Sequence, residues 1–267
     1  MKIRFKRSYI GIPYVLFMVL FVLLPLFFVA FYAFTNSAGR FSFEPMVNFF
    51  TSSAKWRVLF VSFIFGILNT ALCLVIGYPL AMILANRKYN TNAVLVMLFV
   101  MPMWINFIIR SWAMRDVLVF LGIGGGEYPE LATLLGLTYN YLPFTILPLY
   151  STMLKMDKNQ IEASYDLGAG PVTTFFKVIV PMTMPGIISA ATMVFMPTMT
   201  SYVIADILGE GKVTLFGKYI EIYFTQNIWN EGSFLALVML ALIGISVLVP
   251  KLLTRKEAKV KGVGIYD

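Results

Sequence analysis

Residues 161–181 read IEASYDLGAGPVTTFFKVIVP, a largely polar stretch between two long apolar segments. Ile161–Leu167 can form two turns of helix, Gly168 can end them, and Pro171 suits the first turn of a second helix. Pro181 and another proline four residues later are expected to break that second helix before the next apolar segment. The stretch therefore predicts a helix, a glycine joint, a second helix and a proline exit, which together offer a surface to a partner outside the membrane.

The composition predicts an integral membrane protein. Hydrophobic residues make up 59% of the 267 positions and charged residues 13%, whereas ordinary soluble domains carry roughly 25% charged residues. The chain has no histidine and one cysteine, which excludes a Ser-His-Asp triad, an internal disulfide and a zinc cluster. It also lacks a GxxxxGK[ST] phosphate-binding loop. We therefore expect no enzymatic activity, no catalytic or metal-binding residues and no cofactor bound by this chain.

Six apolar segments are long enough to form membrane spans, because a helix needs about 20 mostly apolar residues to cross about 30 Å of hydrocarbon. Several contain prolines, which membrane helices tolerate when neighbouring helices satisfy the freed carbonyl groups. The sequence thus predicts an all-α polytopic membrane protein in a lipid bilayer. The six predicted transmembrane helices are Tyr9–Phe34, Val58–Ala85, Ala93–Leu121, Leu131–Leu154, Gly186–Leu208 and Ser233–Leu253.

The placement of positive charge predicts the orientation. With the N-terminus inside, the inner segments hold fourteen of the 21 lysines and arginines and the outer segments hold five, while Arg110 and Arg115 lie within the third span. Such an excess marks the cytoplasmic side, so both termini are expected in the cytoplasm. The same placement accounts for the net charge of +8 without a nucleic-acid partner.

The polar stretch carries a spacing that is typical of one family. Its elements are Glu162-Ala163-Ser164, three residues, Gly168, nine residues and Val178-Ile179-Val180-Pro181. They resemble the EAA motif of permease subunits of bacterial ABC importers, which runs Glu-Ala-Ala, three residues, Gly, nine residues and Ile-x-Leu-Pro. Ser164 replaces the second alanine, a small-for-small departure. In that family the loop forms a coupling helix that sits in a cleft of the ATPase subunit.

The resemblance implies the type I ABC-importer permease fold, a bacterial cytoplasmic membrane and a partner ATPase dimer that binds ATP and Mg²⁺. It also divides the chain into an N-terminal anchor helix with the first outer loop (1–57), a transmembrane domain (58–254) with the coupling loop (155–185), and a basic cytoplasmic tail (255–267). The residues expected to couple to the ATPase are Glu162, Ala163, Ser164, Asp166, Gly168 and Pro181.

A narrower resemblance extends over most of the chain. Several segments are similar, in order, to the B-type permease subunits of spermidine/putrescine importers. In that family this subunit pairs with a second, C-type permease, an ATPase dimer and an extracytoplasmic polyamine-binding protein. The segments are Met101–Arg110, Tyr141–Phe144 with Pro148–Ser151, Pro181–Ile187 and Ser201–Gly209.

A polycation inside the membrane needs carboxylates, carbonyl oxygens or aromatic faces, since ammonium groups bind π-clouds. Ionisable residues within membrane spans are therefore candidates for the cargo path. Arg110 would repel a polyamine, so we assign it a gating or structural role. Arg115 and Asp116 are neighbours in sequence and are not expected to face each other on a helix. The residues assigned to the substrate path are Asp206, Asp116, Trp104, Tyr141, Tyr150 and Tyr202.

Other interpretations remain open at this point. An importer permease for molybdate, sulfate or iron has a related scaffold, and an anionic cargo would make Arg110 and Arg115 attractive and Asp206 unfavourable. An intramembrane enzyme would need clustered nucleophiles and bases, which a chain without histidine does not offer. A channel that works alone would leave the long inner loop unexplained.

Overall fold

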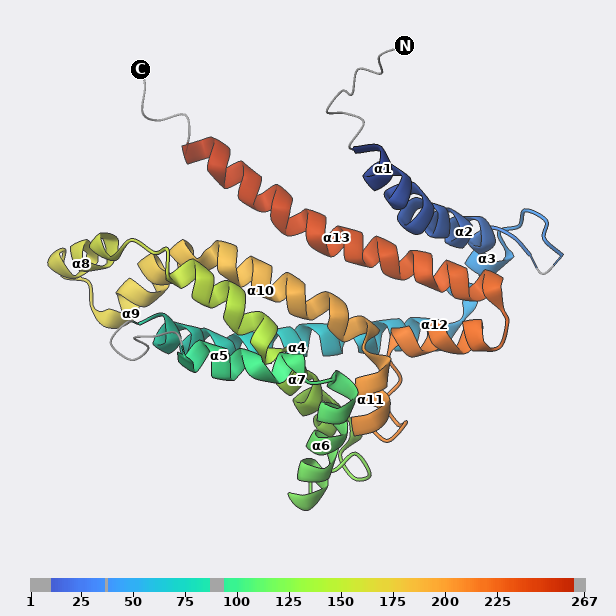
Figure 1. Cartoon of the computed structure of the whole chain (residues 1–267), viewed down its shortest axis with the longest axis horizontal. Coiled ribbons are helices and arrows are strands. Elements are labelled where there is room, and N and C mark those ends of the chain that lie inside the picture. The colour runs from blue at the N-terminus through green and yellow to red at the C-terminus, as the bar shows by residue number, and fades with distance from the viewer. Residues whose placement is uncertain (1–10, 37, 87–93, 262–267) are drawn as a thin grey trace, which may run out of the picture. The chain divides into compact units, whose positions relative to one another are not determined.

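The computed structural model describes residues 11–36, 38–86 and 94–261, which form helices joined by turns (Figure 1). Within these ranges there is no β-strand, only an isolated bridge between Thr35 and Phe41, so the prediction of an all-helical chain is confirmed. In chain order the elements are α1 (Ile12–Met18), η2 (Val19–Leu23), α2 (Leu24–Ala33), α3 (Glu44–Thr51), α4 (Ser53–Ala85), α5 (Val94–Val100), η3 (Met101–Trp104), α6 (Phe107–Phe120), α7 (Pro129–Met153), α8 (Lys158–Asp166), α9 (Pro171–Thr174), η4 (Phe175–Ile179), α10 (Val180–Thr200), α11 (Tyr202–Leu208), α12 (Phe216–Thr225) and α13 (Trp229–Lys261).

The chain divides into two compact units, which are described separately. The first unit contains residues 1–57 and 219–245, and the second contains residues 58–218 and 246–267. The second unit holds both the predicted coupling loop and the predicted substrate-path residues.

Polar contacts hold the first unit together. Glu231 on α13 accepts a hydrogen bond from the Asn48 side chain at 2.7 Å and makes a largely buried ion pair with Lys55. The Asn230 side chain donates to the backbone oxygen of Thr35 at 2.6 Å. These contacts fasten the segment between α2 and α4 to the start of α13.

Fewer helices than the six predicted are both long and apolar enough to cross a membrane. α7 has 25 residues, but its threonine, tyrosine, asparagine and proline residues lower its apolarity. The pair formed by α5–η3 and α6 counts as a fifth span only if its two parts are taken together. Among the described residues, four helical stretches meet both conditions: Pro13–Ala33, Ser53–Ala85, Pro171–Thr200 and Trp229–Leu248.

The third predicted span, Ala93–Leu121, is not one straight helix. Its two parts are bent by 99° at a break between η3 and α6. Ile105 is extended there, and the Asn106 side chain accepts a hydrogen bond from the Ile108 amide at 2.8 Å. In a continuous helix the Ile108 amide would donate to a carbonyl of the preceding turn. The Asn106 side chain replaces that acceptor, so α6 can start in a new direction.

The fifth predicted span, Gly186–Leu208, lies in a different register. One helical stretch of 30 residues runs from Pro171 to Thr200 through α9, η4 and α10. Ser201 ends it with φ −79° and ψ 58°, and α11 follows as a separate short helix.

The predicted proline exit is wrong. Pro181 is the second residue of α10 and Pro185 lies inside it, without a break in the helix. The π-helical turn η4 comes directly before α10, and at its end the Val180 amide donates to the Phe175 oxygen. Proline has no amide to donate to the preceding turn. The wider π-helical turn shifts the hydrogen bonds next to this position, so the helix continues through the proline.

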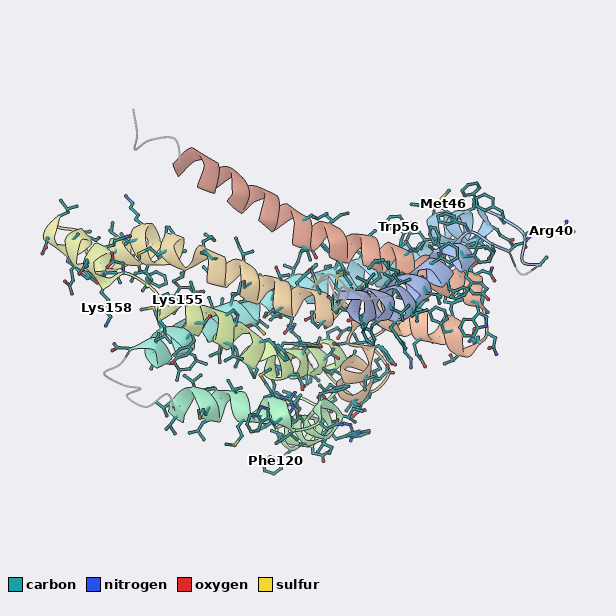
Figure 2. All side chains as sticks on the ribbon, turned by 45° about the horizontal axis from the view of Figure 1, so that its top comes forward. Arg40, Met46, Trp56, Phe120, Lys155 and Lys158 are labelled. Atoms are coloured by element: carbon teal, nitrogen blue, oxygen red, sulfur yellow. The ribbon has the colours of Figure 1, made fainter. Side chains whose placement is uncertain are left out.

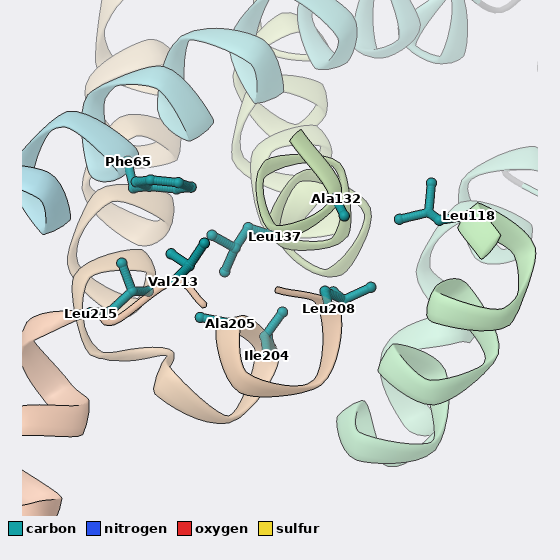
Figure 3. Packing of buried hydrophobic residues seen from close by; sticks show 9 residues of the cluster. All are labelled: Phe65, Leu118, Ala132, Leu137, Ile204, Ala205, Leu208, Val213 and Leu215. Carbon is teal, nitrogen blue, oxygen red and sulfur yellow. The ribbon is translucent and has the colours of Figure 1, made fainter. Parts of the chain in front are cut away.

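α7 lies at the centre of the second unit. It packs along α10 and also contacts α5, α6 and α11. A Cβ atom added to Gly136 on α7 would lie 1.8 Å from the Leu208 side chain of α11, so glycine allows this close approach. Figure 3 shows the hydrophobic cluster around α7, which consists of Phe65, Leu118, Ala132, Leu137, Ile204, Ala205, Leu208, Val213 and Leu215.

A buried polar network also joins three helices of this unit. Asn69 on α4 is fully buried, and its side chain donates to the Thr198 hydroxyl of α10 at 2.7 Å. It also accepts a hydrogen bond from the Thr138 hydroxyl of α7 at 3.0 Å. Hydrogen bonds of this kind hold helices together where a hydrophobic driving force is lacking.

Candidate functional site: a coupling loop and a cavity

The predicted coupling loop, residues 155–185, folds as α8, a short turn and the helix that begins with α9. Asp157 caps α8 by accepting a hydrogen bond from the Asn159 amide at 3.0 Å. Gly168 has φ +82°, a conformation that is costly for residues with a side chain. Its amide donates to the Tyr165 oxygen at 2.8 Å, which closes the end of α8. The helix, glycine joint and second helix are confirmed, although α8 starts three residues earlier than predicted.

Ser164 contacts the inside of this loop. Its hydroxyl lies 3.0 Å from the hydroxyl of Thr174, and both side chains are buried. The hydrogen bond joins α8 to α9 across the glycine turn. The serine that replaces alanine in the motif therefore adds a bond within the loop and leaves the outer surface unchanged.

The outer side of the loop presents both charged and apolar groups. Glu162, Ala163 and Asp166 are exposed. Leu167 is 89% exposed and Val172 is 68% exposed. We call these five residues the coupling surface. Exposed apolar side chains with polar groups around them are the arrangement found at protein–protein interfaces.

A cavity of about 640 Å³ opens beside α6, α7 and α11 in the second unit, a volume within the usual range of small-molecule sites. Three of the predicted substrate-path residues, Trp104, Tyr141 and Tyr202, line it. Phe107 and Phe144 add two further rings to its wall. The cavity is thus rich in aromatic faces.

Hydrogen-bonding groups that the sequence analysis missed also line the cavity. The first is Ser201, which lies at the break between α10 and α11 and whose hydroxyl is hydrogen-bonded to the Tyr141 hydroxyl. The Asn140 side chain donates to the Gly136 oxygen at 2.9 Å, but its own oxygen has no hydrogen-bond partner in the part of the chain that the structure describes. Asn106, the cap of α6, is a third such residue. Asparagine inside an apolar segment was the signal that could have indicated these positions.

Arg110 lies in the wall of the cavity and is only 7% exposed. Its Nε and Nη1 atoms have no hydrogen-bond acceptor among the described residues. Its guanidinium carbon lies 6.0 Å from the centre of the Tyr139 ring. A buried cation with unused donors is unfavourable unless an acceptor from outside the chain reaches it.

Asp206 lies at the edge of this region, one helical turn after Tyr202 on α11. It does not line the cavity, and its carboxylate lies 2.9 Å from the ammonium of Lys218. The same ammonium lies 5.4 Å from the centre of the Tyr202 ring. The sequence analysis did not assign Lys218 to the site, because it comes from a different segment.

The other two predicted path residues lie elsewhere. The Asp116 side chain is 76% exposed and lies 3.7 Å from Arg115, whose closer partner is Glu210 at 3.0 Å. The long arginine side chain reaches both carboxylates, so the expectation that Arg115 and Asp116 do not meet is wrong. Tyr150 packs against a separate hydrophobic cluster that contains Leu149.

The coupling loop and the cavity occupy different parts of the second unit. In Figure 2, Lys155 and Lys158 mark the part that contains α8, and Phe120 marks the end of α6. Tyr141 in the cavity wall precedes the last residue of α7, Met153, by twelve residues, which is about 18 Å along a helix. α7 and α10 connect the two sites.

Comparison with known proteins identifies the class. Residues 77–256 match the family described as the inner membrane component of binding-protein-dependent transport systems. The match covers more than half of the chain, so the chain belongs to this family of transport permeases, which are not enzymes.

The similar proteins include one named group within this class. The spermidine/putrescine transport system permease protein PotB of Haemophilus influenzae is 36% identical over 251 residues, which cover 85% of this chain and 84% of that protein. The protein of the same name from Escherichia coli is 32% identical over 209 residues, covering 73% of this chain and 76% of the other. The predicted resemblance to these permeases is confirmed.

Solved structures of a bacterial ABC transporter that imports alginate have the same fold. One superposes with a TM-score of 0.67 at 17% identity and covers 92% of this chain and 98% of the other. A second, in complex with a periplasmic protein that binds an alginate pentasaccharide, has a TM-score of 0.73 at 12% identity, with 94% of each chain covered. At this identity the likeness establishes the fold alone.

Proposed function

We propose that this chain is the membrane-spanning permease subunit of an ATP-driven importer for the polyamines spermidine and putrescine. The observation that carries the cargo assignment is the 36% identity to PotB of Haemophilus influenzae over 85% of the chain. A permease forms the path of its cargo, so a likeness along most of its length supports a shared cargo.

The chemistry of the cavity is compatible with such a cargo. Trp104, Tyr141 and Tyr202 offer aromatic faces to an ammonium group. Asn140 adds a buried side-chain oxygen to this wall, and an amide oxygen is a hydrogen-bond acceptor. Asp206, one turn beyond Tyr202, supplies a carboxylate near this wall.

In this proposal the chain crosses a bacterial cytoplasmic membrane six times, with both termini in the cytoplasm. The six spans are the four apolar helices, the bent pair of α5–η3 and α6 taken as one span, and α7. The excess of lysine and arginine in the inner segments supports the orientation. The anchor region (1–57), the transmembrane domain (58–254) and the basic tail (255–267) remain the proposed divisions.

The proposed partners are an ATPase dimer, a C-type permease and an extracytoplasmic polyamine-binding protein. ATP and Mg²⁺ bind to the ATPase, which docks on the coupling surface with Gly168 and Pro181 nearby. Ser164 contributes to coupling from inside the loop, where its bond to Thr174 holds α8 against α9. The helical stretch from Pro171 to Thr200 runs without a break from the coupling loop to the cavity wall, about 45 Å along a helix axis. Closure of the ATPase dimer is thereby transmitted to the cavity, which opens alternately to the two sides of the membrane.

A second candidate function is an importer of a small anion such as molybdate or sulfate. The observation that favours it is Arg110, a buried cation with unused donors in the cavity wall. An oxyanion would satisfy these donors directly. Under the polyamine proposal Arg110 keeps a gating or structural role and does not contact the cargo.

Uptake by the complete complex distinguishes the two candidates. The complex is reconstituted in liposomes with its binding protein and ATP, and uptake of labelled spermidine, putrescine, molybdate, sulfate and iron is measured. We expect ATP-dependent uptake of the polyamines alone, a loss of uptake in Asp206→Asn, and continued uptake in Arg110→Lys. Uptake of an oxyanion that depends on Arg110, without uptake of a polyamine, would replace the proposed cargo.

A further inference from the structure

Two of the contacts of the Lys218 ammonium together describe a binding site for an ammonium group. Its Nζ atom lies 2.9 Å from Oδ2 of Asp206 and 5.4 Å from the centre of the Tyr202 ring. Asp206 and Tyr202 are four residues apart on α11, so they lie on one face of the helix. A carboxylate and an aromatic face on the same side of a helix are two groups that recognise an alkylammonium.

The chemistry of Lys218 matches that of the proposed cargo. A lysine side chain ends in a primary ammonium on a four-carbon stem, and each end of a polyamine is likewise a primary ammonium on an alkyl chain. Tyr202 lines the cavity, so the site continues directly from the cavity wall.

We propose that Asp206 and Tyr202 form an ammonium site which Lys218 occupies when no cargo is present, and that a terminal ammonium of the cargo displaces Lys218 during transport. Lys218 then acts as a tethered competitor: it neutralises Asp206 while the site awaits cargo. The inference rests on the proposed function, because it requires an alkylammonium as cargo.

The exposure of the pair makes this exchange possible. The side chains of Lys218 and Asp206 are 28% and 33% exposed, and water can solvate the lysine as it leaves. Partly exposed ion pairs are weak enough to be exchanged. The pair between Lys55 and Glu231 in the first unit is a contrast, because its side chains are only 6% and 17% exposed. A buried pair of that kind is costly to open.

The test measures equilibrium binding of labelled spermidine to the complete permease–ATPase complex in detergent, without the binding protein. We expect Lys218→Met to bind spermidine about three- to tenfold more tightly than the wild type, because the competing ammonium is gone. Lys218→Arg retains a competing cation and should bind as weakly as the wild type. Asp206→Asn removes the carboxylate and should bind more weakly than either.

A purely structural role for Lys218 predicts no gain in affinity for spermidine. In that case Lys218→Met binds spermidine no more tightly than the wild type, and this result overturns the inference. The melting temperature of each complex shows whether a loss of binding comes from unfolding.

A chemical restoration keeps the inference testable if Lys218→Met does not assemble. Lys218→Cys is purified and then treated with 2-bromoethylamine, which converts the cysteine to a lysine analogue; the wild-type complex receives the same treatment as a control. The native Cys73 is fully buried in this chain. We expect tighter binding before treatment and wild-type binding after it, and unchanged binding through both steps would refute the tethered competitor.

The same experiments separate this inference from the proposed function. If the wild-type complex in liposomes takes up no polyamine, the cargo assignment fails. If it takes up polyamines but Lys218→Met binds them no more tightly, only the role of Lys218 fails.

Discussion

The coupling loop and the cavity are built in different ways. The coupling loop is one contiguous stretch, and its cap, its glycine turn and its internal hydrogen bond all join residues no more than ten positions apart in sequence. The cavity instead brings together three separate segments, around residues 103–110, 140–144 and 200–204. Two of these segments contain the helix breaks at Ile105 and Ser201.

The difference shows where a cavity arises in an apolar helical protein. The helical segments before and after Ile105, and those before and after Ser201, would otherwise be continuous helices. The cavity is lined by residues on either side of each of these breaks. The surface proposed to contact the ATPase depends on local backbone geometry, whereas the cavity depends on how separate helices pack. Substitutions in the two regions should therefore affect different measurements.

The largest effect is expected at the glycine turn of the coupling loop. Gly168→Val places a β-branched residue at φ +82°, which costs at least about 1–2 kcal/mol locally and distorts the coupling surface. We expect uptake to fall to background while the protein still inserts and binds its partner permease. Gly170→Ala is the matched control, because Gly170 has φ −70° and nothing lies near an added Cβ. Normal uptake by Gly168→Val at normal expression would remove the coupling role.

The next effect tests the connection between the two regions. Asn69→Ala removes two hydrogen bonds that join α4 to α7 and α10, and we expect a loss of about 1–2 kcal/mol in stability. The melting temperature and uptake should fall together, since both regions depend on α7 and α10. Thr70→Val is the control, because among the described residues the Thr70 hydroxyl donates to Gly66 of its own helix and to no other helix. Loss of uptake at an unchanged melting temperature would contradict a purely structural role for Asn69.

A smaller effect is expected in the cavity. Tyr141→Phe removes the hydrogen bond to Ser201, which is worth about 1 kcal/mol and positions the break between α10 and α11. Uptake should fall a few-fold, while ATP hydrolysis by the complex in the absence of cargo stays unchanged. Ser201→Ala should give the same loss, and the double variant should lose no more than either single one. Additive losses would show that the two hydroxyl groups act separately.

The smallest effect is expected at the position where the coupling motif departs from its family. Ser164→Ala removes the bond to Thr174 and restores the alanine of the motif, at a cost of about 0.5–1 kcal/mol. Because the loss of one internal hydrogen bond leaves the coupling surface in place, uptake should change less than about twofold. A loss as large as that of Gly168→Val would mean that Ser164 contacts the ATPase directly.

Much of the coupling loop could be predicted from the sequence because its geometry depends on near neighbours. The short helix, the glycine turn at Gly168 and the second helix follow from backbone preferences. Pro181 was misjudged, because the π-helical turn before it cannot be recognised from apolarity or proline alone.

The cavity could be predicted only in part. Trp104, Arg110, Tyr141 and Tyr202 were assigned to the path or its gate and do line one cavity. Asp116 was assigned with them but is not among the lining residues, although it is on the same helix as Arg110, and its side chain is 76% exposed. The 99° break before α6 was not predicted either. Hydropathy cannot reveal such a break, because the residues on both sides of it are apolar.

The polar character of α7 has a consequence for how the protein is made. A segment leaves the insertion machinery for the lipid according to its own apolarity, and α7 buries polar side chains such as Asn140 and Thr145 against other helices. Lipid alone would solvate its threonine and asparagine side chains poorly, so α7 needs contact with neighbouring helices to stay in the membrane during biosynthesis. Its polar side chains meet helices that precede it in the chain, Asn69 of α4 and Ser111 of α6, and it also packs along α10, which follows it. An α7 segment made without these neighbouring helices should therefore be held insecurely in the membrane.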